Sequence, residues 1–197
     1  MGSMTTLDGL EELLHVNRCT PGRISAEIGK IFRVRQTEVG LLWLEGDFLR
    51  FLFPIELQSA GAIPVTGSAV AARTASTGQA EIFNRFPQVP HHSIFEQIKL
   101  KDTERLSDMP DPIQKMMSAP IMEGDHRVLG VVQVCRKGMT PGIAGPDFTD
   151  DDLDLLVRAA RRIAMLMPEL DYGDNHQPPQ MLRFQHSADT PKRANAS

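Results

Sequence analysis

Apolar residues recur with a helical period in three stretches of the chain. Residues 7–14 carry leucines at helical spacing with acidic residues between them, which predicts an amphipathic first helix. A second helix is predicted to begin at Thr20-Pro21, a capping residue followed by proline, and to end near Arg33. Phe148-Thr149 opens a third, longer helix, which Pro168 ends.

Other apolar runs predict strands. Residues 39–45 are nearly all apolar, which is typical of a central strand covered on both faces. Residues 48–57 alternate more and contain Pro54, which predicts an edge strand or a bulge. Glu45-Gly46-Asp47 forms the predicted turn between these two runs, and two later apolar runs meet in a predicted hairpin at residues 123–126.

The middle of the chain, residues 59–106, has a weaker pattern. Residues 66–68 precede an Ala-rich stretch, 69–77, which we expect to form a short helix stopped by Gly78. Residues 81–84 are predicted to be extended, and another short helix is predicted to begin at His92.

Three motifs in the second half resemble those of the GAF domain family. Ser118-Ala119-Pro120-Ile121 fits its "S-x-P-I" strand, residues 129–134 fit its "hGVhQh" strand (h, apolar), and residues 148–152 fit its "F-T-x-x-D" helix start. Residues 63–78 are similar to the family's middle portion. The resemblance covers residues 20–167 and implies an α+β fold with an antiparallel sheet of about five or six strands. It also implies terminal helices on one face, with residues 59–106 covering the other, where family members hold ligands.

Composition limits the class of protein. The chain has 197 residues, 41% of them hydrophobic, which suits one domain with a substantial core. We expect an N-terminal helix in residues 1–19, a GAF-like domain in 20–168 and a disordered tail in 169–197. The net charge of −4 argues against nucleic-acid binding, and the two cysteines fit a reducing compartment. Without a membrane-length apolar run or a leader, a soluble cytoplasmic protein with no membrane partner is expected.

The resemblance also bears on function. Cyclic-nucleotide-binding relatives carry Asn-Lys and later a Glu where this chain has Cys135-Arg136 and Leu153, so weak binding of cyclic nucleotides is expected. Sulfoxide reductases of this fold need pocket cysteines, whereas Cys19 precedes a helix and Cys135 ends a strand. The leading interpretation is a non-enzymatic signalling module for an unidentified small molecule or protein partner, with its cofactor unknown. A structural adaptor with a self-filled pocket and a methionine-sulfoxide-reductase-type enzyme stay open as alternatives.

A homodimer is expected from two apolar lines on the terminal helices. The first is the leucine stripe of residues 7–14, and the second is formed by Leu155, Ala159 and Leu166. Closed two-fold pairs are the commonest assembly.

The resemblance places any ligand over the sheet, beneath residues 66–95. Gln133 lies mid-strand among valines, where it either projects into this pocket or pairs with a buried backbone group. The histidines and the acidic run 150–152 are interpreted as loop and helix-start residues, not as metal ligands. Phe83, Phe86, Ile94 and Phe95 would favour the adaptor if they plug the pocket. The expected polar contacts are Thr66, Ser68, Asn84, His91 and His92, and the expected apolar wall is Phe53, Ile82, Phe86 and Phe95.

Overall fold

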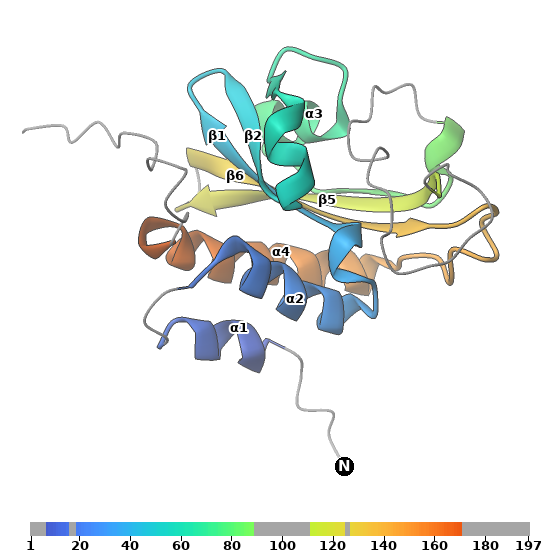
Figure 1. Ribbon diagram of the computed structural model, residues 1–197, viewed down its shortest axis with the longest axis horizontal. Coiled ribbons are helices and arrows are strands. Elements are labelled where there is room, and N and C mark those ends of the chain that lie inside the picture. Colours follow the sequence, from blue (N-terminus) through green and yellow to red (C-terminus); the bar gives the residue numbers. More distant parts are fainter. Residues whose placement is uncertain (1–6, 16–18, 89–110, 125–126, 171–197) are drawn as a thin grey trace, which may run out of the picture.

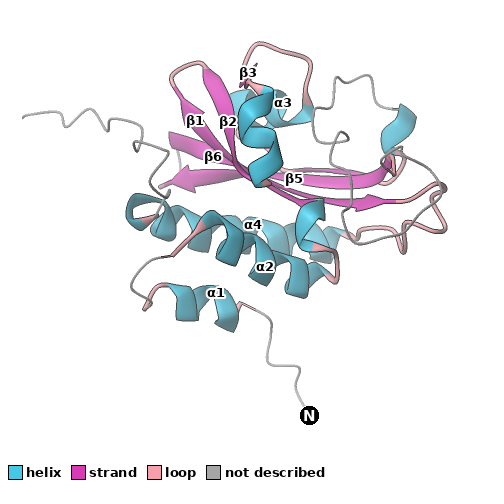
Figure 2. Ribbon diagram, viewed as in Figure 1, coloured by secondary structure: helices cyan, strands magenta, loops and turns pink. Residues whose placement is uncertain are grey.

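The computed structural model describes residues 7–15, 19–88, 111–124 and 127–170. These residues form one sheet with helices packed on both of its faces (Figures 1 and 2). Helices α2 (Pro21–Phe32) and α4 (Asp150–Leu166) cover one face of the sheet, α1 (Asp8–Leu13) packs on the outer side of these two helices, and α3 (Val70–Thr77) covers the other face. The sheet has six strands in the order β3-β2-β1-β6-β5-β4, and every pairing is antiparallel. The α+β prediction is therefore confirmed. The strands are β1 (Val39–Glu45), β2 (Phe48–Phe53), β3 (Ala62–Pro64), β4 (Glu81–Phe83), β5 (Ile113–Glu123) and β6 (Arg127–Lys137).

Helices α2 and α4 begin and end where local signals predict. The Thr20 hydroxyl oxygen accepts a hydrogen bond from a backbone N–H of the first turn of α2, and Arg33 closes that helix in the left-handed conformation, φ 53°. Thr149 and Asp152 form a capping box at the start of α4. Pro168 follows α4 in a short 3-10 turn, Met167–Glu169.

Strand β1 occupies the predicted central position, between β2 and β6. The glycine of the "hGVhQh" motif, Gly130, lies against this strand. A Cβ added to Gly130 would lie 2.1 Å from the carbonyl oxygen of Leu42, so only glycine allows β6 to approach β1 this closely.

The prediction of an edge strand at Pro54 is wrong, whereas the bulge alternative fits. β3 pairs along the outer side of β2, which places β2 inside the sheet, and β2 ends at Phe53. Leu41 pairs with Phe53 and Leu42 with Phe51, so β2 has one extra residue there. A proline just beyond the last paired residue costs the ladder no hydrogen bond.

Two apolar clusters fill the two faces of the sheet. The helix-side cluster joins α1, α2 and α4 to the sheet, and the α3-side cluster joins α3 to the opposite face. Leu10 and Leu13 of α1 are buried in the helix-side cluster. Residues 1–19 were expected to form an N-terminal helix ahead of the domain, but α1 contributes to the core of the domain itself. The helix-side cluster includes Leu10, Ile24, Ile28, Leu41, Met117, Val132, Leu156 and Ile163, and the α3-side cluster includes Leu42, Phe51, Leu57, Ala72, Phe86, Ile113, Met116 and Val131.

The apolar residues from which a dimer was expected are used inside this chain. Ala159 and Leu166 are buried in the helix-side cluster, and Leu155 packs against it. The homodimer stays a prediction, but these residues no longer motivate it.

Some predicted features lie outside the described residues, namely the helix beginning at His92 and the tail beyond residue 170. Leu170, the last described residue, forms a parallel bridge with Cys19 at the start of α2. None of the described helices has the length and hydrophobicity needed to cross a lipid bilayer.

Candidate functional site

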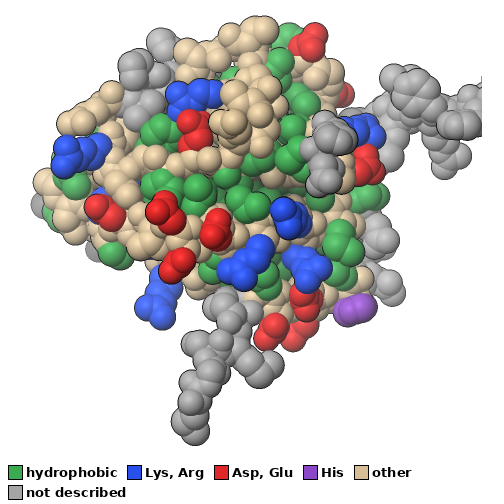
Figure 3. Space-filling view, turned by 180° about the vertical axis from the view of Figure 1, so that it is seen from behind, with side chains coloured by type: hydrophobic (Ala, Val, Ile, Leu, Met, Phe, Trp, Pro, Cys, Tyr) green, Lys and Arg blue, Asp and Glu red, His purple; other side chains and the backbone are tan. Residues whose placement is uncertain are grey.

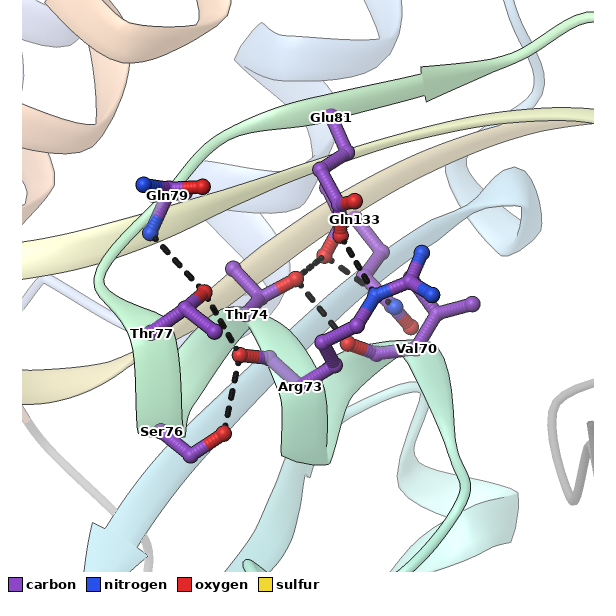
Figure 4. Close-up of polar contacts among 9 residues, drawn as sticks. Val70, Arg73, Thr74, Ser76, Thr77, Gln79, Glu81 and Gln133 are labelled. Carbon is purple, nitrogen blue, oxygen red and sulfur yellow. Dashed lines mark hydrogen bonds and ion pairs between the residues drawn. The ribbon is translucent and has the colours of Figure 1, made fainter.

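A chain of three buried polar side chains crosses the sheet face beneath α3 (Figure 4). The hydroxyl oxygens of Thr74 and Ser118 lie 2.7 Å apart, and Gln133 Nε2 donates to Ser118 Oγ at 3.3 Å. Thr74 also donates to the carbonyl oxygen of Val70 at 2.9 Å. Their exposed fractions are 0% for Thr74, 0% for Ser118 and 4% for Gln133. Buried polar groups require hydrogen-bond partners, and here two strands and helix α3 supply them to one another.

The donor of each hydrogen bond among these three side chains can be assigned, starting from Gln133 at one end and Thr74 at the other. The Gln133 amide donates to Ser118, and the single hydroxyl proton of Thr74 goes to the Val70 carbonyl oxygen. Ser118 is left to donate to Thr74, so each hydroxyl donates once and accepts once. The hydrogen bonds therefore run in one direction, from strand β6 through β5 to α3.

Local alternation places these residues on one face. Ser118 and Gln133 are direct partners in the β5–β6 ladder, so their side chains share a face. Their neighbours Met117 and Val134 point to the helix-side cluster instead. Thr74 lies in α3, which contacts both strands.

The outer edge of this site is a charged pair. Arg73 Nε lies 2.8 Å from Glu81 Oε2, and the guanidinium lies 5.1 Å from the ring centroid of Phe83. Both charged side chains are partly exposed, at 46% and 31%, so the pair contributes less than about 1 kcal/mol. The Arg73–Glu81 pair therefore links α3 to strand β4 only weakly.

Beside the polar chain the site is apolar and aromatic. Phe86 is 1% exposed, and its ring meets that of Phe83 edge to face at 6.3 Å between centroids. Leu42, Met116 and Val131 belong to the same cluster. The site thus combines an aromatic wall with a small set of directed polar groups, the usual composition of a small-molecule site.

Of the residues predicted to bind a ligand, the structure brings two together on this face, Phe86 and Gln133. Thr66 and Ser68 are exposed in the loop before α3, and neither caps that helix, whose N-cap is Ala69. Three further predicted residues, His91, His92 and Phe95, lie outside the described residues.

Phe53 and Ile82 point to the opposite face, toward the helix-side cluster, so their place in the predicted apolar wall is wrong. The bulge at the end of β2 reverses the alternation after Phe51 and turns Phe53 toward the helices. In β4 the alternation directs Ile82 to the helix side and Phe83 to the α3 side.

Asn84 is occupied in holding the chain just before α4. Its amide Nδ2 donates to the carbonyl oxygen of Phe148 at 2.9 Å, and its Oδ1 accepts from the Phe148 backbone N–H at 2.9 Å. Arg136 lies over the Phe148 ring at 4.6 Å and donates to the carbonyl oxygen of Phe32. Burial lowers the pKa of Arg136, and the carboxylates of Asp152 and Glu38 oppose this shift. Asn84 and Arg136 therefore hold Phe148, just before α4, against the rest of the domain.

The connection from β6 to α4, residues 138–149, is held at several points. Gln114 Nε2 donates to the Gly138 carbonyl oxygen at 2.9 Å. Lys115 Nζ donates to the Gly145 carbonyl oxygen and lies 2.7 Å from Asp147 Oδ1, while its own side chain is 5% exposed. Met139 and Ile143 point outward from this connection, at 63% and 65% exposed.

The sequence did not single out Thr74 and Ser118 as site residues. Ser118 was part of a recognised motif, and its polar side chain amid apolar neighbours was the available signal. Thr74 gave a similar signal inside an alanine-rich helix. Within the described residues no group of three or more His, Cys, Asp or Glu side chains could hold a metal ion.

Comparison with known proteins agrees with this architecture. The structure is similar to the GAF domain of an Acinetobacter phosphoenolpyruvate-protein phosphotransferase, with a TM-score of 0.57, 13% identity and coverage of 83% of this chain and 92% of that chain. It is also similar to the free methionine-R-sulfoxide reductase of Neisseria meningitidis in complex with its substrate, with a TM-score of 0.58, 15% identity and coverage of 83% and 87%. At these identities the likeness shows the fold alone.

A search of curated protein sequences finds no match. The family model described as "GAF domain" matches residues 3–167, which include α1 as well as the sheet and the α3 face. This chain belongs to the GAF domain family.

Proposed function

We propose that this chain is a non-enzymatic sensory module, a cytoplasmic homodimer that binds a small molecule or a protein partner at the α3 face of its sheet. The observation that carries the proposal is the buried chain of Gln133, Ser118 and Thr74. Gln133 and Ser118 lie in paired strands of the sheet, whereas Thr74 lies in α3, a helix of eight residues. A ligand oxygen that accepts from Ser118 can replace Thr74 without leaving a buried donor unpaired.

The likeness to sulfoxide reductases is the main argument for an enzyme, and the cysteines speak against that chemistry here. Cys19 is buried in the helix-side cluster and Cys135 in the α3-side cluster, so the sheet lies between them. A disulfide requires Cα atoms within about 7 Å and Cβ atoms that point toward each other. Redox chemistry by these two thiols as a pair does not fit this arrangement.

Native mass spectrometry of the full chain tests the proposal. A protein purified gently from its expression host is expected to retain a small molecule as a discrete mass excess over the polypeptide. Gln133→Leu is expected to lose that excess, because it removes the amide on which the polar chain ends. Ser76→Ala, a change on the exposed side of α3, is the control and should keep it. A bare polypeptide mass in every preparation would contradict small-molecule binding.

The self-filled adaptor is the second candidate, and the burial of Phe86 favours it. Phe83 and Phe86 occupy part of the face that a ligand would use. Phe86→Ala distinguishes the two candidates. In an adaptor it only lowers stability, by about 3–5 kcal/mol. In a ligand-binding module it also changes the amount of retained small molecule.

A further inference from the structure

An open groove, which we call the α4–hairpin groove, lies between the tip of the β5–β6 hairpin and the C-terminal half of α4. Its volume is about 510 Å³, within the range of sites that hold small ligands. Figure 3, seen from behind, shows basic side chains beside apolar ones on this side of the molecule. The hairpin contributes Met122 and Glu123 to the lining, and α4 with the turn after it contributes Arg161, Ala164, Met165 and Pro168.

Apolar side chains line most of this groove and are open to solvent in it. Met165 is 56% exposed, Pro168 is exposed, and Met122 and Ala164 are half-buried. The residue after Met165, Leu166, is 1% exposed in the helix-side cluster, because α4 fills the core with its other face. Met165 is therefore not part of the domain's own core.

The groove also has a cation at its edge, Arg161. The next residue, Arg162, lies 2.8 Å from Glu11, and the acidic residue of the lining, Glu123, lies 3.0 Å from Arg127. Arg161 itself makes no ion pair within the part of the chain that the structure describes. The groove thus suits an occupant with apolar side chains and a nearby negative charge.

The described part of the chain ends beside this groove. Leu170, the last described residue, is 7% exposed and forms a bridge with Cys19. Pro168, two residues earlier, lines the groove, and two residues span at most about 7 Å. The point from which residues 171–197 start is therefore held close to the groove.

Residues 173–197 contain one cluster of large apolar side chains, Met181, Leu182 and Phe184. Ten residues separate this cluster from Leu170. A segment of that length reaches about 35 Å when extended and about 20 Å on average, which is more than the distance from Leu170 to the groove. Such a tether gives the cluster a local concentration on the order of millimolar, at which even a weak contact forms.

We propose that this cluster of the C-terminal tail docks in the α4–hairpin groove of the same chain. The tail starts beside the groove, and its large apolar side chains match the apolar lining. Asp171 and Asp174, in the segment that connects Leu170 to the cluster, complement Arg161. Methionine suits such a lining because its side chain adapts to the shape of an occupant. This inference goes beyond the proposed function, since neither the α3 face nor a second copy takes part.

The sequence of the tail also assigns its side chains to the groove. Pro178-Pro179, just ahead of the cluster, favours an extended backbone. In an extended segment successive side chains point to opposite sides, so Leu182 and Phe184 share one side and Arg183 lies on the other. Leu182 and Phe184 therefore enter the groove and cover Met165, while Arg183 faces solvent. Docking of this kind ties the β5–β6 hairpin to the end of α4.

Photo-crosslinking of the full chain tests the location. A photoreactive benzoyl-phenylalanine in place of Phe184 is close to the native side chain in shape and bonds to side chains that it touches. On irradiation it should join to the peptide that contains Met165 or to the one that contains Met122, within a single chain. The same probe in place of Ala194, ten residues beyond the cluster, is the control and should show no preference for these peptides.

Hydrogen exchange of the full chain measures how much of the tail is docked. The backbone amides of residues 182–184 should exchange about threefold or more slowly in the wild type than in Met165→Glu, which puts a carboxylate into the apolar lining. Met139→Glu is the matched control, because it makes the same change at a residue that is 63% exposed and lies outside the groove. It should leave the exchange of residues 182–184 as in the wild type.

Three results would overturn the proposal. Equal exchange of residues 182–184 in the wild type, Met165→Glu and Met139→Glu would show that the groove does not hold the tail. Cross-links from position 184 that favour α3 would assign the tail to the opposite side of the sheet. A cross-linked product with twice the mass of the chain would show that the tail docks on a second copy.

Discussion

The two faces of the sheet are covered in different ways. The helix-side cluster packs against α1, α2 and α4, and its contacts across the middle of the sheet are between apolar side chains. The α3 face is closed by an eight-residue helix and has a chain of polar groups crossing its centre. Apolar burial is non-directional, whereas hydrogen bonds require particular partners at particular positions. We therefore expect the first face to contribute more of the stability, and we propose that the second face selects what binds to it.

The largest expected effect is on the helix-side cluster. Ile163→Ala, in α4, should lower the free energy of unfolding by about 2–5 kcal/mol, because Ile163 is fully buried. Ile55→Ala makes the same chemical change at a position that is 66% exposed and should cost about 0.5 kcal/mol or less. Urea denaturation measures both. Equal costs would contradict the view that burial of Ile163 in the helix-side cluster stabilises the fold.

The next largest effect is expected for the hydrogen-bonded side chains Thr74, Ser118 and Gln133. Ser118→Ala should cost about 1–3 kcal/mol, because the Gln133 amide and the Thr74 hydroxyl both lose their common partner. Replacing all three groups by apolar ones, Thr74→Val with Ser118→Ala and Gln133→Leu, should cost less than the sum of the single changes. Urea denaturation of the three single variants, the triple variant and the wild type checks this. Strict additivity would mean that the three side chains do not act as one network.

Asn84 attaches the segment after β4 to the residue just before α4, and replacing it tests that attachment. Asn84→Ala removes two hydrogen bonds to the Phe148 backbone and should cost about 1–2 kcal/mol. Asn84→Asp keeps the acceptor and loses the donor, so thermal melts should place it between Asn84→Ala and the wild type. If Asn84→Asp is the worse of the two, repulsion from the Phe148 carbonyl oxygen dominates.

The smallest expected effect is at the outer edge of the α3 face. Glu81→Gln should cost less than about 1 kcal/mol, because the pair it weakens is exposed. That cost should shrink further as salt is added. Melting curves at low and high salt check both statements, and a large salt-independent loss would mean that the pair holds α3 firmly.

The fold could be predicted largely because its signals are local. Thr20-Pro21, Thr149 with Asp152, and Gly78 each act within one helical turn, and each helix boundary lies where these residues predict. The turn at Gly46 is equally local, with φ 57° in the structure. Such features do not depend on which part of the chain packs against them.

The candidate site could be predicted only in part, because it depends on distant pairings. Thr74 and Ser118 are 44 residues apart, and nothing near either residue indicates the other. Phe53 was placed on the wrong face because a one-residue bulge reverses an otherwise regular alternation. Asn84 was taken for a ligand contact because its partner, Phe148, is 64 residues away.

The anchored connection between β6 and α4 has a consequence for proteolysis. A protease must draw several residues of its substrate into an extended form, so exposed loop tips are cut where the chain can open locally. Met139 and Ile143 offer side chains that a chymotrypsin-like or elastase-like enzyme would accept. Two points of this connection, Gly138 and Gly145, are held by the side chains of Gln114 and Lys115 from β5. We therefore expect cleavage to be slow until β5 releases these two side chains, in which case nicking of this segment would report opening of the sheet end.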